Sequence, residues 1–224
     1  TQIIKKKLEH KTLNLNQDST TVVPQMNNAK DINFYLSKYN LDDPWDIVDY
    51  FEKKISSYLG SQYGISVDCC THGIFLCLKY LKSNSIIDIP ENTYISIPNV
   101  INMAGYKFEF KKKEWNGDYK LDPLPIVDSA CKFTKNMYKK NTLTCLSFHH
   151  RKHLAIGRGG MILTDDHKAY EWLKMARYDG RHLDRKYDKD DFEMLGYHMY
   201  MTPEQACIGL EKLEEFDDKN LSIG

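Results

Sequence analysis

The stretch "SFHHRKHLAIGRGG", residues 147–160, places a single lysine, Lys152, between a strand-like run and a glycine cluster. The preceding "NTLTCLSFHH" (141–150) alternates in the manner of a strand, and the following "GMILTDD" (160–166) has the composition of another. A lysine in a loop between two buried strands risks losing its charge, so it either reaches water or has a covalent role. Most single lysines reach water. The residues around Lys152 indicate whether it does so or has a covalent role.

Segments with strand and helix periodicity alternate along most of the chain. Helices are expected at 46–60, 71–82, 93–105, 167–177 and from 203 onward, and strands at 63–69, 85–90, 106–110, 124–130, 142–148 and 160–164. The last helix has a clear start, because Thr202 as N-cap, Pro203 at N1 and Gln205 at N3 form a capping box. The alternation predicts an α/β domain of three layers, with a mainly parallel mixed sheet and helices on both faces.

The composition is that of a soluble globular protein. The 224 residues are 42% hydrophobic and 28% charged with a formal net charge of zero, which gives no reason to expect a nucleic-acid partner. No apolar run approaches the ~20 residues of a membrane span and no signal-peptide pattern is visible, so no membrane association is expected. The six cysteines form no CxxC pair, which favours a reducing, cytoplasmic location over a zinc site or a disulfide framework. Residues 1–30 are polar and unpatterned and are expected to form an N-terminal arm.

The informative side chains are those that follow the strands, because ligands of such sheets lie beyond the carboxyl ends of the strands. Thr71 is a candidate N-cap of a helix whose free N–H groups would attract an anion, although an ordinary cap is the commoner case. Tyr94 offers a platform for a flat ring, with a core tyrosine as the alternative. Asp128 closes an apolar strand, where an acid needs a cationic partner, and a structural salt bridge is the alternative there.

Together with Lys152, these residues form the set that pyridoxal 5'-phosphate requires. The lysine amine would form a Schiff base with the aldehyde of the cofactor. The Asp128 carboxylate would keep the pyridine nitrogen protonated, so that the ring can accept electrons. The helix end at Thr71 and the hydroxyl of Ser147 would hold the phosphate. Each residue alone is a weak indication, but their joint occurrence favours a pyridoxal-phosphate site.

The sequence resembles the sugar aminotransferases of the DegT/DnrJ/EryC1/StrS family, which are fold-type-I pyridoxal-phosphate enzymes. The resemblance covers most of residues 44–218 and rests on "IPENTYISIPNVINMAGYKFEF", "PIVDSA" and "SFHHRKHLAIGRGG". The last motif matches the serine, phenylalanine, Schiff-base lysine and closing glycines of the family without a gap. The resemblance therefore implies the large domain of a fold-type-I aminotransferase.

Roles for individual residues follow from the same resemblance. Lys152 would be the Schiff-base lysine and the proton shuttle, Asp128 would pair with the pyridinium nitrogen, and Tyr94 would stack on the ring. The phosphate would be held by Thr71, by the neighbouring amide of Cys70 and by Ser147. The sites of the family are shared across a homodimer, in which the segment "LGYHMY", containing His198, would reach in from the other subunit.

Four features depart from the family pattern. Cys70 stands where the family usually has glycine, and its Cβ demands an ordinary backbone conformation at the phosphate turn. Cys131 stands where a glutamine or histidine usually contacts the ring hydroxyl, and His198 replaces the usual asparagine. The sequence ends at Gly224, so residues 31–224 are expected to form the pyridoxal-phosphate-binding large domain, with the C-terminal small domain absent.

Three functions are compatible with these features. The leading hypothesis is transfer of an amino group from an amino acid, expected to be glutamate, to a nucleotide-linked keto-sugar in amino-sugar biosynthesis. The alternative is a catalytically degenerate cofactor-binding, regulatory or partner protein of the same family. A nucleotide-binding module built on "GRGG" is weakly supported, because no complete phosphate-loop motif is present. The charged segment 177–200, with Arg177, Arg181, His182 and Arg185, would meet a diphosphate or form a solvated surface.

Overall fold

A computed structural model describes residues 31–183 and 185–216. The helices are α2 (Ile32–Tyr39), α3 (Pro44–Leu59), α4 (Cys70–Leu81), α5 (Ser96–Met103), α6 (His167–Ala176), α7 (Pro203–Glu214) and the short 3-10 helix Tyr187–Lys189. The strands are β1 (Tyr63–Val67), β2 (Ile87–Pro90), β3 (Phe108–Lys111), β4 (Tyr119–Lys120), β5 (Ile126–Asp128), β6 (Leu143–Ser147) and β7 (Gly160–Thr164). Every helix and strand expected from the sequence is found, and α2 and β4 are additional. The expected arm at 1–30 lies outside the described residues.

The main sheet has five strands in the order β1-β7-β6-β5-β4. Strand β7 is antiparallel to both β1 and β6, so β1 and β6 run in the same direction, and β5 is parallel to β6. Strand β4 is antiparallel to β5, and β2 and β3 form a separate parallel pair. The sheet is mixed as expected, but within the described residues β5 and β6 form the one parallel pair among its four neighbouring pairs, so the expectation of mainly parallel pairing is corrected. Strand β7 is reversed because a loop joins it directly to β6 instead of a helical crossover.

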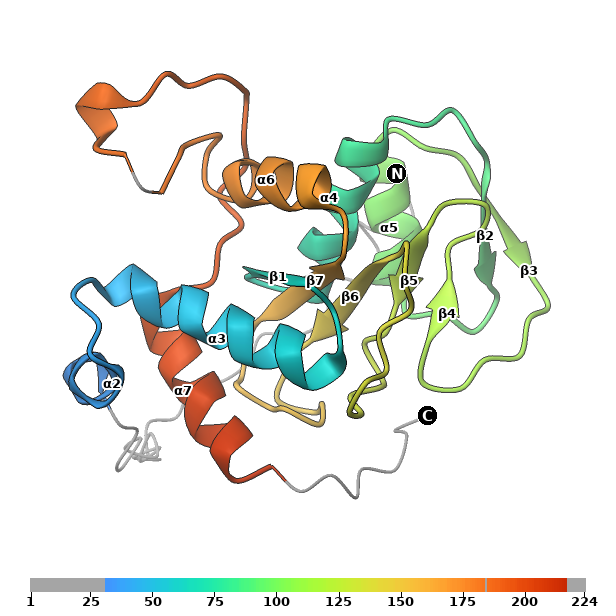
Figure 1. Cartoon of the computed structure of the whole chain (residues 1–224). Coiled ribbons are helices and arrows are strands. Elements are labelled where there is room, and N and C mark those ends of the chain that lie inside the picture. Colours follow the sequence, from blue (N-terminus) through green and yellow to red (C-terminus); the bar gives the residue numbers. More distant parts are fainter. Residues whose placement is uncertain (1–30, 184, 217–224) are drawn as a thin grey trace, which may run out of the picture.

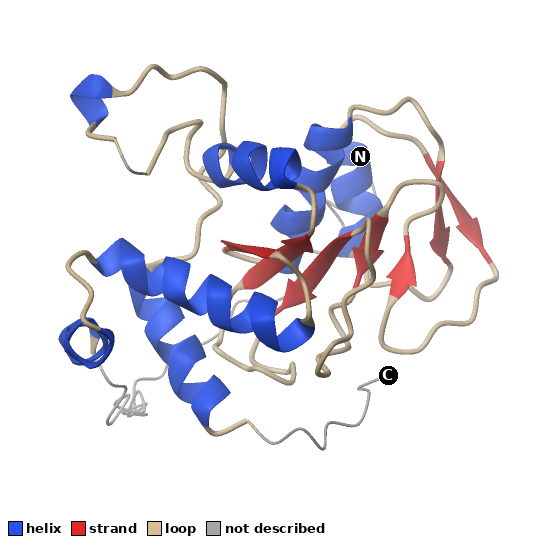
Figure 2. Ribbon diagram, viewed as in Figure 1, coloured by secondary structure: helices blue, strands red, loops and turns tan. Residues whose placement is uncertain are grey.

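Helices cover both faces of this sheet, which gives the three predicted layers (Figure 1). Helices α4, α5 and α6 pack on one face, while α2, α3 and α7 pack on the other (Figure 2). Successive side chains of β7 divide between the two cores: Ile162 belongs to the first, and Met161 and Leu163 belong to the second. Both faces of the strands are therefore buried, as their apolar sequences require.

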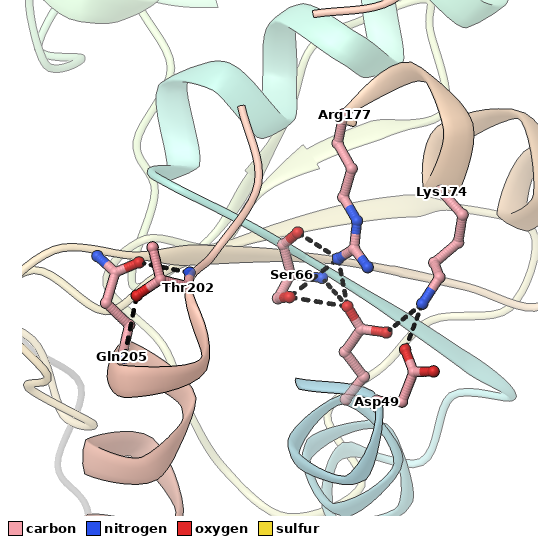
Figure 3. Close-up of polar contacts among 7 residues, drawn as sticks. Asp49, Ser66, Lys174, Arg177, Thr202 and Gln205 are labelled. Carbon is pink, nitrogen blue, oxygen red and sulfur yellow. Dashed lines mark hydrogen bonds and ion pairs between the residues drawn. The ribbon is translucent and has the colours of Figure 1, made fainter. Parts of the chain in front are cut away.

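A buried ion-pair network joins α3, β1 and the end of α6 (Figure 3). The Arg177 guanidinium donates to the carboxylate of Glu52 and to Ser66, and both the N–H and the hydroxyl of Ser66 donate to the same carboxylate. Lys174 approaches Glu52 at 3.1 Å. Arg177 is therefore a buried structural residue, and for this residue both interpretations of the segment 177–200, contact with a diphosphate and a solvated surface, are wrong.

The other basic side chains named in that segment, Arg181, His182 and Arg185, also have carboxylate partners. His182 contacts Asp190 at 2.8 Å, and Arg181 lies 3.8 Å from the same carboxylate. Arg185 pairs with Asp191 at 2.9 Å.

None of the helices within the described ranges has the length and apolar character that crossing a lipid bilayer requires.

Candidate active site

A pocket of about 620 Å³ opens where β1, β5 and β6 end. It is lined by seven of the eight residues that the sequence predicts for the site: Cys70, Thr71, Tyr94, Asp128, Cys131, Ser147 and Lys152. These residues come from five separate segments of the chain. The fold therefore brings together groups that the sequence relates only by their positions after strands and helices.

Lys152 lies in the loop that joins β6 to β7. The loop is closed at its base, where the Phe148 N–H donates to the Gly159 carbonyl at 2.9 Å. Gly157 has a positive φ of 99°, a conformation that favours glycine and lets the chain return toward β7. The Nζ atom of Lys152 lies 3.1 Å from the Sγ atom of Cys131, within the pocket. The amine of Lys152 therefore lies in the same pocket as the other predicted residues.

Asp128 is a buried carboxylate whose hydrogen-bond donors within the described ranges are all neutral. The hydroxyl of Tyr119 donates to one oxygen at 2.9 Å, and the Ala130 N–H donates to the other at 3.0 Å. The Cys70 thiol is a weak third donor at 3.9 Å. Burial raises the pKa of Asp128, although these hydrogen bonds and the nearby charge of Lys152 oppose the rise. The carboxylate retains free lone pairs, so it is suited to accept one further, cationic donor.

The phosphate end predicted from the sequence lies at the start of α4, with one correction. Cys69, not Thr71, is the N-cap, because its Sγ atom accepts the His72 N–H at 3.4 Å. Thr71 lies inside the first turn, and its hydroxyl donates to Ser96 Oγ at 2.9 Å. Candidate caps so close together in sequence cannot be ranked without the backbone. The N–H groups of Cys70 and Thr71 in this first turn have no partner inside the helix and are available to an anion.

Gly160 allows β7 to pass directly behind this helix start. It is the register partner of both Val67 at the end of β1 and Ser147 at the end of β6. A Cβ atom at residue 160 would lie 2.6 Å from the backbone of Cys69 and Cys70, which is closer than real atoms approach. Glycine at this position therefore lets β7 pass this close to the backbone at the start of α4.

Aromatic rings form part of the wall of the pocket. Tyr94 is 74% exposed, so its ring is available to a ligand. The rings of Trp115 and Tyr119 lie 5.0 Å apart, and the Trp115 indole N–H donates to Asn92. The hydroxyl of Tyr119 also contacts that of Thr93. Sequence reasoning missed Tyr119 because β4 has two residues, too few to show a strand period, although its register places Tyr119 opposite Asp128.

His198 is the predicted site residue that the pocket does not include. Its side chain is exposed, and its Nδ1 atom lies 3.0 Å from the Asp179 carboxylate. The next residue of the segment, Met199, accepts the Asp68 N–H at 3.0 Å beside the start of α4. The segment thus passes close to the start of α4 while His198 faces solvent.

The residues present fit pyridoxal phosphate. The pocket combines an amine, a buried carboxylate with neutral donors, an exposed aromatic ring, and a helix start beside a hydroxyl. Its volume lies in the range of ordinary cofactor sites. These groups have the chemical types that the aldehyde, ring nitrogen, ring face and phosphate of the cofactor require.

Comparison with known proteins gives consistent relatives. The profile of the DegT/DnrJ/EryC1/StrS aminotransferase family matches residues 27–135 and 134–222. GDP-perosamine synthase from Caulobacter vibrioides is 36% identical over 75% of this chain and 56% of the relative. UDP-4-amino-4,6-dideoxy-N-acetyl-beta-L-altrosamine transaminase from Campylobacter jejuni is 23% identical over 76% of this chain and 57% of the relative. The chain thus spans little more than half the length of these curated relatives.

The fold has solved counterparts. AtS13 from Actinomadura melliaura superposes with a TM-score of 0.65 at 19% identity, covering 83% of this chain and 64% of that one. The sugar aminotransferase CalS13 from Micromonospora echinospora superposes with a TM-score of 0.62 at 17% identity, covering 75% and 60% of the two chains. At such identities the agreement is one of fold, and it confirms the fold-type-I architecture.

Proposed function

The chain belongs to the DegT/DnrJ/EryC1/StrS aminotransferase family, and from this premise we propose that it transfers an amino group with pyridoxal phosphate as cofactor. The acceptor is a nucleotide-linked keto-sugar and the donor is an amino acid, with glutamate the first candidate. The names of the perosamine and altrosamine relatives support a nucleotide-linked sugar as the substrate class.

The observation that carries this proposal is that Lys152 and Asp128 line the same pocket as the start of α4. An amine, an acid and an anion-binding helix start can satisfy three different parts of one cofactor at once. A structural salt bridge, the alternative explanation for Asp128, would require a cationic partner, whereas its donors in the described part of the chain are neutral.

Each residue then has a defined task. Lys152 would hold the cofactor covalently through Nζ, Asp128 would hold a proton on the ring nitrogen, and Tyr94 would cover the ring. The amides at Cys70 and Thr71, with the Ser147 hydroxyl, would bind the phosphate. When bound, pyridoxal phosphate supplies a carbonyl carbon that takes up an amino group and a ring that accepts electron density.

The chain's own groups supply the proton movements. The Lys152 amine would move a proton to and from the carbon that bears the amino group. The Cys131 thiol, 3.1 Å from Nζ, would position this amine between transfers. Burial raises the pKa of Tyr119, so Tyr119 stays protonated and keeps donating to Asp128. That bond orients the carboxylate toward the ring nitrogen.

Reduction of the cofactor complex tests the assignment of Lys152. Borohydride treatment of the yellow complex should fix the cofactor to the peptide that contains Lys152, and Lys152→Ala should lose the label. Incubation with glutamate and candidate nucleotide keto-sugars, followed by mass spectrometry, should then reveal an aminated sugar. A label on a different lysine would overturn the assignment. Labelling of Lys152 without any turnover would favour the degenerate cofactor-binding alternative.

A further inference from the structure

Arg158 reaches the cofactor pocket from the loop that carries Lys152. It stands between Gly157 and Gly159, and its side chain lines the pocket although it is 65% exposed. One guanidinium nitrogen, Nη2, donates to the Asp68 carboxylate at 2.7 Å. A guanidinium carries five N–H groups, so this bond leaves most of its donors free for a second anion.

Asp68 directly precedes Cys69, the N-cap of α4, so its contact brings Arg158 to the phosphate end of the pocket. The backbone gives an independent measure of the same closeness. Gly160 lies two residues after Arg158. A Cβ atom added to Gly160 would be 2.6 Å from the carbonyl carbon of Cys69 and 2.6 Å from the nitrogen of Cys70. Arg158 is therefore held beside the free N–H groups that begin α4.

The charges around this helix start sum to a positive value. His72 Nδ1 lies 2.6 Å from Asp68, and the hydrogen bonds that the imidazole donates to Asp68 and Cys69 raise the pKa of His72 to about 10. At neutral pH the protonated His72 and Arg158 therefore flank the single negative charge of Asp68. The net charge of one positive unit adds to the positive end of the helix dipole. Such a site favours a phosphate over a neutral group.

We propose that Arg158 is a phosphate-binding residue of the cofactor site, with Asp68 holding its guanidinium in place. The inference rests on the proposed function, because it takes pyridoxal phosphate as the ligand. Arg158 contributes through the phosphate alone and has no part in holding the ring. It should therefore affect binding of pyridoxal phosphate but leave binding of pyridoxal, which lacks the phosphate, unchanged.

The test is titration of the full chain with each of the two compounds, followed by visible absorption and by quenching of Trp115, which lines the pocket. Arg158→Gln should weaken pyridoxal phosphate binding roughly 10- to 100-fold, the value of a charge-assisted hydrogen bond to a charged group. Pyridoxal binding should not change. Arg158→Lys, which keeps the charge without the fork, should give an intermediate loss.

Arg185→Gln is the matched control. It removes the same charge from a comparable exposed pair, Arg185 with Asp191 at 2.9 Å, outside the residues that line the pocket. Its affinities for both compounds should equal those of the wild type. Equal losses for both compounds in Arg158→Gln, or no loss for either, would overturn the role in phosphate binding while leaving the proposed function standing. A wild type that takes up neither compound would overturn both.

Discussion

At the scale of single residues, Asp128 shows how the site sets function against stability. Its carboxylate is buried among neutral donors, and burial raises its pKa, which means that the ionised form is less favourable in the folded chain than in water. A structural acid would be paired with a cation. An acid kept in this state is suited to a ligand that brings the positive charge with it.

Asp128→Asn should therefore separate transamination from cofactor binding. Transamination should fall by at least ~10²-fold, because a neutral amide cannot hold the ring nitrogen protonated, a loss comparable to that of other preorganised electrostatic groups. The cofactor should still bind through Lys152. Turnover assays alongside absorption spectra of the bound cofactor measure the two effects. Near wild-type turnover would refute the role of Asp128.

For Asp128→Asn we expect a loss of activity but no loss of thermal stability. Folding raises the pKa of Asp128, so ionisation of its carboxyl group destabilises the cofactor-free protein at pH values above 3.8, the ordinary pKa of the group. This lost stability returns as the pH falls through the raised pKa. The melting temperature of cofactor-free Asp128→Asn at neutral pH should accordingly not be lower than that of the wild type. A clear drop would indicate that the ionised carboxylate stabilises the fold.

Residues of the site were predictable where they follow strands, and not elsewhere. Lys152, Asp128 and Ser147 follow or end strands with readable alternation, so their meeting at one edge followed from the sheet. Tyr119 and Arg158 could not be found this way. One lies on a two-residue strand, and the other depends on a carboxylate 90 positions away in the sequence.

At the scale of elements, the buried pair of Glu52 and Arg177 fastens α3 to β1 and to the end of α6. Burial by itself would raise the pKa of Glu52, but the charges of Arg177 and Lys174 and the hydrogen bonds from Ser66 lower it to about 2. Helical periodicity places Glu52 on α3 but says nothing of its partners, because these lie on other elements. The network was therefore not predictable from the sequence.

Glu52→Gln should destabilise the protein by roughly 3–5 kcal/mol, because it leaves the Arg177 charge buried without its counter-ion. The wild-type stabilisation is complete above the ordinary glutamate pKa of about 4.5 and is lost as pH falls toward about 2. Urea unfolding at several pH values should show the gap between variant and wild type closing across that window. The matched control is Glu171→Gln, whose exposed pair with His167 should contribute at most about 1 kcal/mol. Equal effects of the two variants would contradict a special role for Glu52.

At the scale of the whole molecule, the alternation of helices and strands was enough to predict three layers, but not the order of the sheet. Strand β7 lies between β1 and β6 because the loop that carries Lys152 returns the chain to one particular side of β6. No local sequence pattern predicts which side of β6 that is. The sequence pattern also did not predict which large apolar side chains are exposed. Large apolar side chains remain exposed next to the pocket, with Tyr94 at 74% and Ile95 at 66%, and Leu195 in the segment before His198 is 95% exposed.

These exposed side chains lead to a prediction about assembly. We expect a homodimer, because apolar groups so exposed beside a binding pocket are typical of a surface that a partner covers. His198 supports the same expectation, since it faces away from the phosphate end of its own chain while its segment passes beside it. In a dimer that shares its sites, the histidine would donate to the phosphate of the other subunit. Each chain alone would then hold an incomplete site.

Cofactor affinity should consequently rise with protein concentration across the range in which sedimentation shows monomers becoming dimers. His198→Ala should leave the dimer intact and weaken pyridoxal phosphate binding, whereas His167→Ala, on the exposed surface of α6, should change neither property. If Arg158 also binds the phosphate, the loss in His198→Ala should be partial, because each subunit keeps a cation of its own at the start of α4. A monomer with full cofactor occupancy would contradict the shared site and leave the role of Arg158 untouched, because that role depends on contacts within one chain.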